Sequence, residues 1–271
     1  MKKAKFMSFV CSMLFIGILF AAAIFFEPAT GGATTFLLGS CGCSLVSPRQ
    51  NPNTVENPFP SISEEPRLIA LTFDDGPSVY TLQLLDALGK RDAFATFFTA
   101  GEAVNVYPTI ANRIVAEGHE IACHAYSHPF LATLSADEIR MELTKSRNAI
   151  YSATGTVPAI LRPPYGNFNS QVQSVAMEFD MPLILWNVDT IDWRDRDVEV
   201  ILGRIINPRG FPLVQSGDII LMHDTLSTTV DAAIKIVYKL QEHGFQFVTV
   251  SQLFDAKDVQ LIPGAVYGCA R

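Results

Sequence analysis

The sequence predicts an α/β domain built as a distorted (β/α)7-type, TIM-like barrel, and two observations support this fold class. From residue 67 onward, short apolar runs of strand length alternate with longer amphipathic stretches of helix length. This repeated strand–helix–strand order implies parallel strand pairing. About seven strands are too few for a standard eight-stranded barrel but suit a distorted one. An open doubly wound sheet is the alternative.

The expected elements follow one another without an internal repeat. The expected strands are the apolar runs at 68–73, 94–98, 120–123, 159–162, 182–186, 218–222 and 245–249. The expected helices lie between them, near 79–91, 106–117, 135–153, 169–180, 197–207 and 228–243. Ser135 and Glu138 have the spacing of a capping box, which marks a helix start. Gly118 and Gly244 stand where helix C-caps are expected.

Residues 1–27 predict a membrane anchor or a signal segment. Three lysines precede an uninterrupted apolar run of 21 residues from Phe6 to Phe26, which Glu27 ends. Roughly 20 apolar residues are needed to cross a bilayer. The lysines place that end in the cytoplasm, which puts the remaining chain outside. We therefore expect a single-pass membrane protein with an extracytoplasmic domain. The alternatives are secretion after cleavage near 21–23 and lipid anchoring at Cys41.

Composition divides the rest of the chain and excludes one class of partner. Residues 28–66 are rich in Pro, Ser, Thr, Gly and Asn and are expected to form a linker. The catalytic domain is expected at 67–255 and a C-terminal tail at 256–271. The net charge of −7 and the lack of a long basic run exclude a nucleic-acid partner. The sequence does not predict the oligomeric state. Of the cysteines outside the expected core, Cys41, Cys43 and Cys269, two could pair in an oxidising compartment.

Chemically capable side chains recur where expected strands end, and in α/β barrels functional residues gather at that edge. Each set taken alone has an ordinary explanation, such as a turn for DDGP. Chance does not usually place all of them at successive strand ends. The sets are Asp74 and Asp75 in TFDDGP, His124 and His128 in CHAYSHP, Arg162 and Tyr165 in RPPYG, Asp189, Asp192 and Trp193 in WNVDTIDW, and His223 and Asp224 in ILMHD.

The aspartates and histidines at these strand ends are typical of metal-assisted hydrolysis of an amide. Two histidines four residues apart and one aspartate supply the three ligands of a catalytic zinc site. The other aspartate of the pair is then free to act as a base. A histidine from another strand end could protonate a departing amine. The remaining histidines, His119 and His243, stand beside helix-ending glycines and are expected at the surface. Cys123 precedes His124 on the strand and is expected in the core.

TFDDGP, HAYSH, RPPYG, DTIDW and ILMH, in this order, resemble the five motifs of the NodB-homology polysaccharide deacetylases, carbohydrate esterase family 4. The resemblance covers roughly residues 67–255 and implies the family's distorted (β/α) barrel. It also implies a metal site formed by Asp75, His124 and His128. Zinc is the expected ion, with cobalt, nickel or manganese as alternatives.

The same resemblance implies a role for each remaining motif residue. Asp74 would be the general base, held in place by Arg162. His223 would be the general acid, oriented by Asp189. The backbone N–H of Tyr165 would help to stabilise the oxyanion. The apolar wall around the acetyl methyl group would come from Trp193 and Leu221.

The expected reaction is removal of N-acetyl groups from a polysaccharide with release of acetate. Peptidoglycan N-acetylglucosamine is the first expected substrate, followed by chitin oligomers or another surface polysaccharide, and then by N-acetylmuramic acid. The rivals are a non-catalytic sugar-binding module and an amidase for small non-sugar amides. One residue departs from the family pattern: Ala125 stands where Ser or Thr is usual, and that hydroxyl helps to brace the ligand loop. The loss of such a hydroxyl can weaken a metal site by about 10–100-fold, and we still expect an active enzyme.

Overall fold

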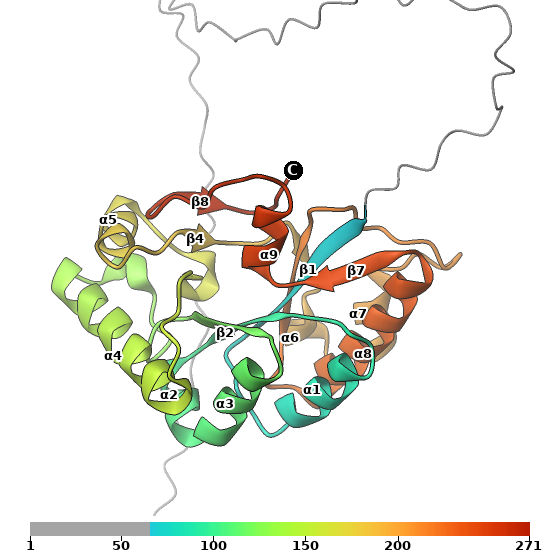
Figure 1. Cartoon of the computed structure of the whole chain (residues 1–271), viewed down its shortest axis with the longest axis horizontal. Coiled ribbons are helices and arrows are strands. Elements are labelled where there is room, and N and C mark those ends of the chain that lie inside the picture. Colours follow the sequence, from blue (N-terminus) through green and yellow to red (C-terminus); the bar gives the residue numbers. More distant parts are fainter. Residues whose placement is uncertain (1–65) are drawn as a thin grey trace, which may run out of the picture. The chain divides into compact units, whose positions relative to one another are not determined.

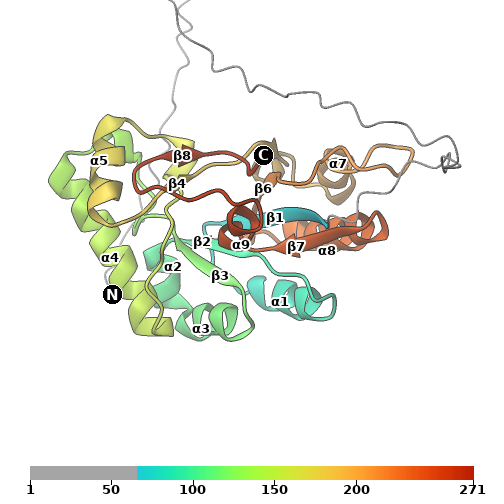
Figure 2. The same ribbon diagram turned by 45° about the horizontal axis from the view of Figure 1, so that its top comes forward.

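The computed structural model describes residues 66–271, and parallel strands form its centre. β1 (Arg67–Asp74) has β6 (Ile219–His223) along one side. Along its other side lie β2 (Thr96–Thr99), beside its second half, and β7 (Phe245–Val248), beside its first half. Figure 1 shows β1 with β2 and β7, and Figure 2 also labels β6. β1 is buried from Leu68 to Asp74, which explains its continuous apolar run.

The strands continue from β2 round to β6. β3 (Glu120–Cys123) pairs with β2, and Cys123 bridges Leu161, which bridges Leu183 in β4 (Leu183–Ile184). β5 (Val188–Asp189) follows a few residues later and pairs with β6. All of these pairings are parallel, and they connect β5, β6, β1, β2, β3, Leu161 and β4 in that order. The distorted barrel that the sequence predicts is confirmed, and the open doubly wound alternative is not observed.

The strand expected at 159–162 is reduced to the single bridge at Leu161. Pro158 and Pro163 stand on either side of this run, and proline cannot donate a hydrogen bond to a strand ladder. The side chain of Arg162 is nevertheless completely buried, so the run still passes through the interior.

All the expected helices are present, and they surround the strands (Figures 1 and 2). Their ends differ from the prediction by a few residues at most. The capping box of Ser135 and Glu138 forms, and Gly118 and Gly244 take left-handed conformations after the helices they follow. The helices are α1 (Thr81–Gly89), α3 (Pro108–Ala116), α4 (Ala136–Thr154), α5 (Ser170–Glu178), α7 (Val198–Gly203) and α8 (Ser227–Glu242).

The C-terminal segment is part of the barrel, so the predicted tail at 256–271 is wrong. β8 (Val266–Tyr267) pairs in parallel with β4, and Cys269 bridges Asp218. Ala270 is buried against the core. A strand of two residues leaves no periodic signal in the sequence. Three short helices also escaped prediction: α2 (Gly101–Val106), α6 (Asp192–Asp195) and α9 (Val250–Asp255).

His119 is buried rather than at the surface, contrary to the expectation. It is 6 % exposed, its ring lies edge-on to Phe97 with centroids 5.6 Å apart, and its Nδ1 accepts the N–H of Ala95 at 3.3 Å. The residue precedes β3, and its side chain enters the space between neighbouring strands. Cys123 lies in the core, as expected.

The predicted membrane segment at 1–27 and almost all of the predicted linker at 28–66 lie outside the described residues, as do Cys41 and Cys43. Within residues 66–271, no helix combines the length and the apolar character needed to cross a bilayer.

Candidate active site

A cavity of about 460 Å³ opens at the edge of the barrel where β1, β3, β5 and β6 end. Its walls bring together residues from all five of the sequence motifs that the analysis singled out. They are Asp74, Asp75, His124, His128, Tyr165, Trp186, Asp189, Trp193, Leu221 and His223. Arg162 is buried and bonds to Asp74.

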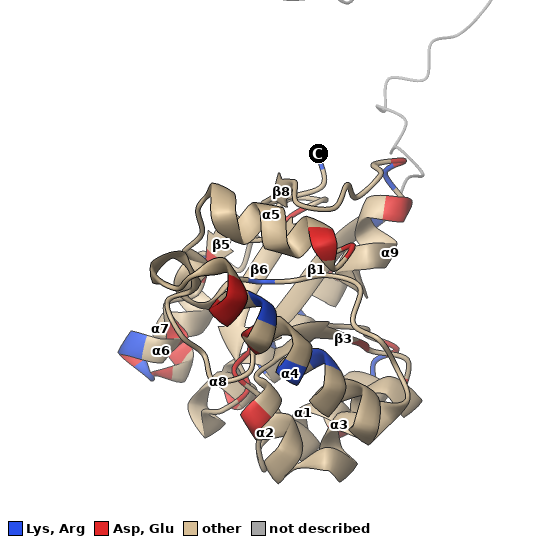
Figure 3. Cartoon of the chain, turned by 90° about the vertical axis from the view of Figure 1, so that its left-hand side faces the viewer, with Lys and Arg blue, Asp and Glu red and all other residues tan. Residues whose placement is uncertain are grey.

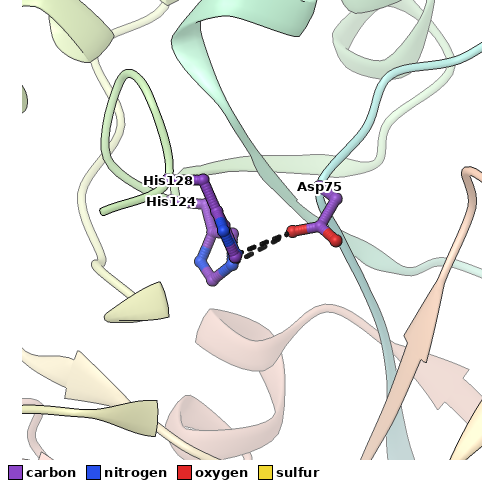
Figure 4. Close-up of side chains that lie close together, drawn as sticks. All are labelled: Asp75, His124 and His128. Carbon is purple, nitrogen blue, oxygen red and sulfur yellow. Dashed lines mark ion pairs between the residues drawn. The ribbon is translucent and has the colours of Figure 1, made fainter. Parts of the chain in front are cut away.

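Asp75, His124 and His128 form a compact cluster of three potential metal ligands (Figure 4). Asp75 Oδ1 lies 3.1 Å from His128 Nε2 and 3.5 Å from His124 Nε2. His124 Nδ1 lies 2.7 Å from the Arg162 carbonyl oxygen, so this nitrogen carries the proton. Nε2 therefore presents its lone pair toward Asp75.

The cluster fits a divalent metal ion. Asp75 Oδ1 is buried and receives no well-directed hydrogen bond from the described residues. A divalent cation between this carboxylate oxygen and the imidazole nitrogens would compensate the buried charge. Two ligands that each lie ~2.0–2.1 Å from a tetrahedral zinc are about 3.3 Å apart, close to the spacing observed here. Burial by itself raises the pKa of Asp75, but the two imidazoles lower this pKa far below its usual range.

Asp74, beside the cluster, is held by a buried arginine. Arg162 Nη1 donates to Asp74 Oδ1 at 2.7 Å and also to the hydroxyl of Thr72. The other guanidinium nitrogens donate to the carbonyls of Ile184 and Leu185, so every nitrogen is used. Burial lowers the pKa of Arg162, and the charge of Asp74 opposes this effect. Asp74 Oδ2 remains directed toward the cluster, 3.7 Å from His124 Nε2.

His223 stands across the cavity, and its partner is Asp192 instead of the predicted Asp189. Asp192 Oδ1 lies 2.9 Å from His223 Nδ1, and Oδ2 accepts the His223 backbone N–H at 2.8 Å. Asp189 accepts a hydrogen bond from the N–H of Ile191 and is exposed. The chain turns at Ile191, which has φ 50°, and α6 then carries Asp192 beneath the end of β6.

The environment of His223 favours its charged form. Burial alone would lower the pKa of this histidine. The hydrogen bond and charge of Asp192, together with the charges of Asp74 and Asp75, raise it to about 9. Asp192 is itself fully buried and accepts a hydrogen bond from Thr229 at 2.8 Å, so it has little freedom to move. His223 Nδ1 is thereby engaged, and Nε2 is left for chemistry in the cavity.

Asp224 supports the loop that carries the aspartate pair and does not line the cavity. Its side chain is completely buried against Gly76, and a Cβ atom at that position would collide with it. The hydroxyl of Thr81 donates to its carboxyl group, and the Ser78 hydroxyl donates to its backbone carbonyl. Burial raises the pKa of Asp224 to about 7.

Several residues around the cavity have strained backbone conformations. Several residues with side chains adopt the left-handed conformation there, which costs of order 1 kcal/mol or more each unless the surroundings enforce it. They are Asp75 (φ 71°), Ala125 (φ 59°), His128 (φ 58°), Tyr165 (φ 60°) and Ile191 (φ 50°). Such clustering is typical of functional sites.

Aromatic side chains form the rim of the cavity. Tyr165 is 56 % exposed and Trp193 is 52 % exposed, whereas Leu221 is buried in the wall. Phe130 stacks on Tyr165 with centroids 4.0 Å apart, and Tyr165 lies edge-on to His128 at 4.5 Å. Phe130 and Trp186 were not predicted as site residues. Phe130 directly follows HAYSHP and Trp186 is the first residue of WNVDTIDW, and these positions are the sequence signal for them.

Comparisons with known proteins agree with this arrangement. The polysaccharide deacetylase family profile matches residues 61–184. The chain is 40 % identical over 198 residues to the peptidoglycan-N-acetylmuramic acid deacetylase PdaC of Bacillus subtilis, a match that covers 73 % of this chain and 41 % of PdaC. The structure of PdaC superposes with a TM-score of 0.67 over 71 % of this chain and 92 % of the solved chain.

Two further relatives are a named deacetylase and a pseudoenzyme of the same family. A peptidoglycan-N-acetylglucosamine deacetylase of Bacillus cereus is 38 % identical over 191 residues, which cover 69 % of this chain and 68 % of that protein. A family pseudoenzyme of Bacillus anthracis is 35 % identical with a TM-score of 0.63, covering 69 % of this chain and 65 % of the solved chain. Similarity therefore extends to active and inactive proteins, and the chain spans less than half the length of PdaC.

Proposed function

The chain belongs to the polysaccharide deacetylase family, carbohydrate esterase family 4, and we propose that it hydrolyses the N-acetyl groups of a polysaccharide to release acetate. One observation carries the proposal: a cluster of three potential metal ligands shares a cavity with Asp74 and His223. The neighbours of Asp74 suit it to accept a proton, and those of His223 suit it to donate one. A carboxylate with one free oxygen suits a base, and a charged imidazole suits an acid.

The residues divide the reaction between them. A divalent ion held by Asp75, His124 and His128 supplies Lewis acidity toward the amide carbonyl and toward water. Asp74 accepts the proton of the attacking water at Oδ2, because Arg162 occupies Oδ1. Oxygen from water adds to the acetyl carbon, and the C–N bond of the amide then breaks.

His223 completes the reaction by giving its proton from Nε2 to the departing amine. Its pKa of about 9 keeps the imidazole charged near neutral pH before the amine leaves. Asp192 holds Nδ1 and stabilises the charge. The products are acetate and a free amino sugar.

Four residues are proposed to bind the substrate. The backbone N–H of Tyr165 is assigned to the oxyanion of the acetyl group, in a loop made rigid by two consecutive prolines. Trp193 and Leu221 are assigned to the acetyl methyl, because both offer apolar surface to the cavity. Asp189 lines the same cavity and is assigned to contact with polar groups of the sugar.

Peptidoglycan N-acetylglucosamine is the proposed substrate, with zinc as the proposed ion. The names of the similar Bacillus proteins support a peptidoglycan substrate, and they include deacetylases of N-acetylglucosamine and of N-acetylmuramic acid. A membrane anchor at 1–27 would hold the domain outside the cell beside this polymer. Chitin oligomers and other surface polysaccharides are the alternatives, as are secreted or lipid-anchored forms of the protein.

Acetate release from purified peptidoglycan and from N-acetylglucosamine oligomers tests the proposal. The full chain, in detergent, is assayed with added zinc and again with a chelator. We expect acetate that the chelator abolishes and that added zinc restores. Folded, zinc-loaded protein that releases no acetate from either polymer but still binds one of them would favour the sugar-binding module. Hydrolysis of small non-sugar amides alone would favour the amidase.

A further inference from the structure

Glu142 is a charged residue in an unusual position. α4 carries acidic and basic residues along its length (Figure 3), and most of them reach solvent. Glu142 is the one charged residue of this helix that is buried, at 8 % exposure. A buried carboxylate costs free energy unless hydrogen bonds or a cation compensate it. No lysine, arginine or histidine among the described residues forms an ion pair with it.

The compensation comes from the loop between the two histidine ligands. Glu142 Oε2 accepts the backbone N–H of Tyr126 at 2.9 Å and of Ser127 at 2.8 Å. Its Oε1 accepts the Ser127 hydroxyl at 2.9 Å. Tyr126 and Ser127 are central in the H-x-x-x-H segment that begins at His124. Hydrogen bonds to an ionised carboxylate are roughly twice as strong as neutral ones.

The loop needs such a clamp because its conformation is strained. Ala125 and His128 both have positive φ, so the segment leaves and re-enters the left-handed region within four residues. On its other side, the N–H groups of Gly101 and Glu102 donate to the carbonyls of Ala125 and Tyr126. A Cβ atom at Gly101 would collide with the Tyr126 ring, so this packing is close. α2 therefore fixes the loop's carbonyls, and Glu142 fixes its N–H groups.

We infer that Glu142 is a positioning residue of the metal centre, which holds His124 and His128 at ligand spacing through the backbone between them. The inference rests on the metal centre of the proposed function. It also changes the expectation for Ala125. That residue is fully buried in an apolar cluster, and the hydrogen bond from the Ser127 hydroxyl to Glu142 already braces this loop without a hydroxyl at 125. An Ala125→Ser variant should therefore leave metal affinity unchanged.

Metal affinity measured without substrate tests the inference. The full chain is stripped of metal, and zinc is titrated in competition with a chromophoric chelator. For Glu142→Ala we expect a Kd about 10–100-fold weaker than for the wild type. Glu142→Gln should recover part of the loss, because an amide oxygen can still accept both N–H groups and the amide nitrogen can donate to Ser127. Ser127→Ala, which removes one of the three bonds, should lose less than Glu142→Ala.

Glu138→Ala is the matched control. It removes a carboxylate from the same helix, one turn away, and breaks the capping box without touching the metal loop. Its zinc affinity should equal that of the wild type even where its stability falls. The inference is overturned if Glu142→Ala folds and binds zinc as tightly as the wild type, or, where Glu142→Ala does not fold, if Ser127→Ala does so. It is also overturned if Glu138→Ala weakens binding as much as Glu142→Ala. Wild-type protein that binds zinc but releases no acetate would contradict the proposed function alone.

Discussion

His124 and His223 face the same cavity from opposite sides, and their neighbours prepare them for opposite tasks. The Nδ1 of His124 lies against a backbone carbonyl, that of Arg162, and the Nδ1 of His223 lies against a carboxylate, that of Asp192. A carbonyl fixes a tautomer without adding charge, so it leaves Nε2 of His124 as a neutral ligand. A carboxylate stabilises the imidazolium, so it keeps a proton on His223.

This difference shows that the acceptor facing Nδ1 influences the protonation state and role of an imidazole more than its position at a strand end does. Both histidines follow apolar strands at the same edge of the barrel. The spacing of His124 and His128 already suggests a ligand pair, and the residue facing each Nδ1 gives the physical reason why His124 suits a metal and His223 suits an acid. Changes to that residue should therefore affect one side of the cavity and spare the other.

Replacing Asp192 should produce the largest effect on the acid side. Asp192→Asn removes the charge that raises the pKa of His223 from its ordinary value of 6.5 to about 9. The pKa should fall, so that less of the acid is charged at neutral pH. We expect kcat for acetate release to drop by about 10²–10⁴-fold. The alkaline limb of the pH profile should also move to lower pH.

Asp189→Asn is the matched control for that change. Asp189 lines the cavity but does not contact His223, so the pKa of His223, followed by NMR in the metal-free protein, should stay near 9. If Asp189→Asn lowers this pKa while Asp192→Asn leaves it in place, the acid side has been assigned to the wrong aspartate.

Replacing Arg162 should lower the free energy of unfolding, because this residue supports the metal-ligand side of the cavity. Its side chain is fully buried against Asp74, and its own carbonyl holds His124. Arg162→Met leaves the Asp74 carboxylate buried without its partner, and breaking such a pair costs about 3–5 kcal/mol. Urea denaturation measures the loss. The double variant Arg162→Met/Asp74→Asn should regain part of the stability, and equal losses in both variants would contradict a charge-based cause.

His119 provides a third histidine environment, in which burial is the largest influence on the pKa. Burial lowers the pKa of this residue from 6.5 to about 4. The unfolded chain takes up a proton below pH 6.5 and the folded chain does not, so stability falls as the pH drops from 6.5 through 4. This contribution is roughly 3 kcal/mol.

His119→Asn isolates the contribution, because asparagine can still accept the Ala95 N–H and does not titrate. Urea denaturation of both proteins between pH 7.5 and 4 measures it. The wild type should lose more stability than the variant over this range. Parallel curves would show that His119 titrates in the folded protein as it does in the unfolded chain.

The smallest effect is expected for Phe130, which touches the ligand side only through Tyr165. Phe130→Ala removes the ring stacked on Tyr165, and aromatic pairs contribute about 0.5–1.5 kcal/mol beyond their buried area. We expect KM for N-acetylglucosamine oligomers to rise by severalfold, because the lost energy of the aromatic pair limits the effect to this size. We expect kcat to change little. A fall in kcat at constant KM would instead give Phe130 a part in the chemical step.

Sequence reasoning predicted those features that depend on short stretches of chain. The parallel barrel followed from apolar runs such as 68–73, and the grouping of the aspartate pair with His124 and His128 followed from their positions at strand ends. The choice of Asp75 as the ligand came from the family resemblance. These inferences succeed because parallel strands bring their C-terminal ends to one edge. The helix start at Ser135 was predictable for a similar reason, since the capping box is complete within four residues.

Other features depend on an unusual backbone turn or on contacts between distant segments, and the sequence does not mark them. The choice between Asp189 and Asp192 depends on the left-handed turn at Ile191, which a β-branched residue gives no reason to expect. Glu142 gives no sequence signal, because its partners are in another loop. The position of the last strand depends on pairing with β4 across more than 80 residues of chain, so no local pattern marks it.

Asp74→Asn tests the central claim most directly, because it separates metal binding from turnover. Zinc content and acetate release from peptidoglycan and N-acetylglucosamine oligomers are measured on the same preparations of variant and wild type. The account predicts equal zinc in both proteins, acetate from the wild type, and a loss of about 10²–10⁴-fold in the variant. Equal rates of acetate release from two equally zinc-loaded proteins would contradict the assignment of Asp74 as the base and with it the proposed mechanism.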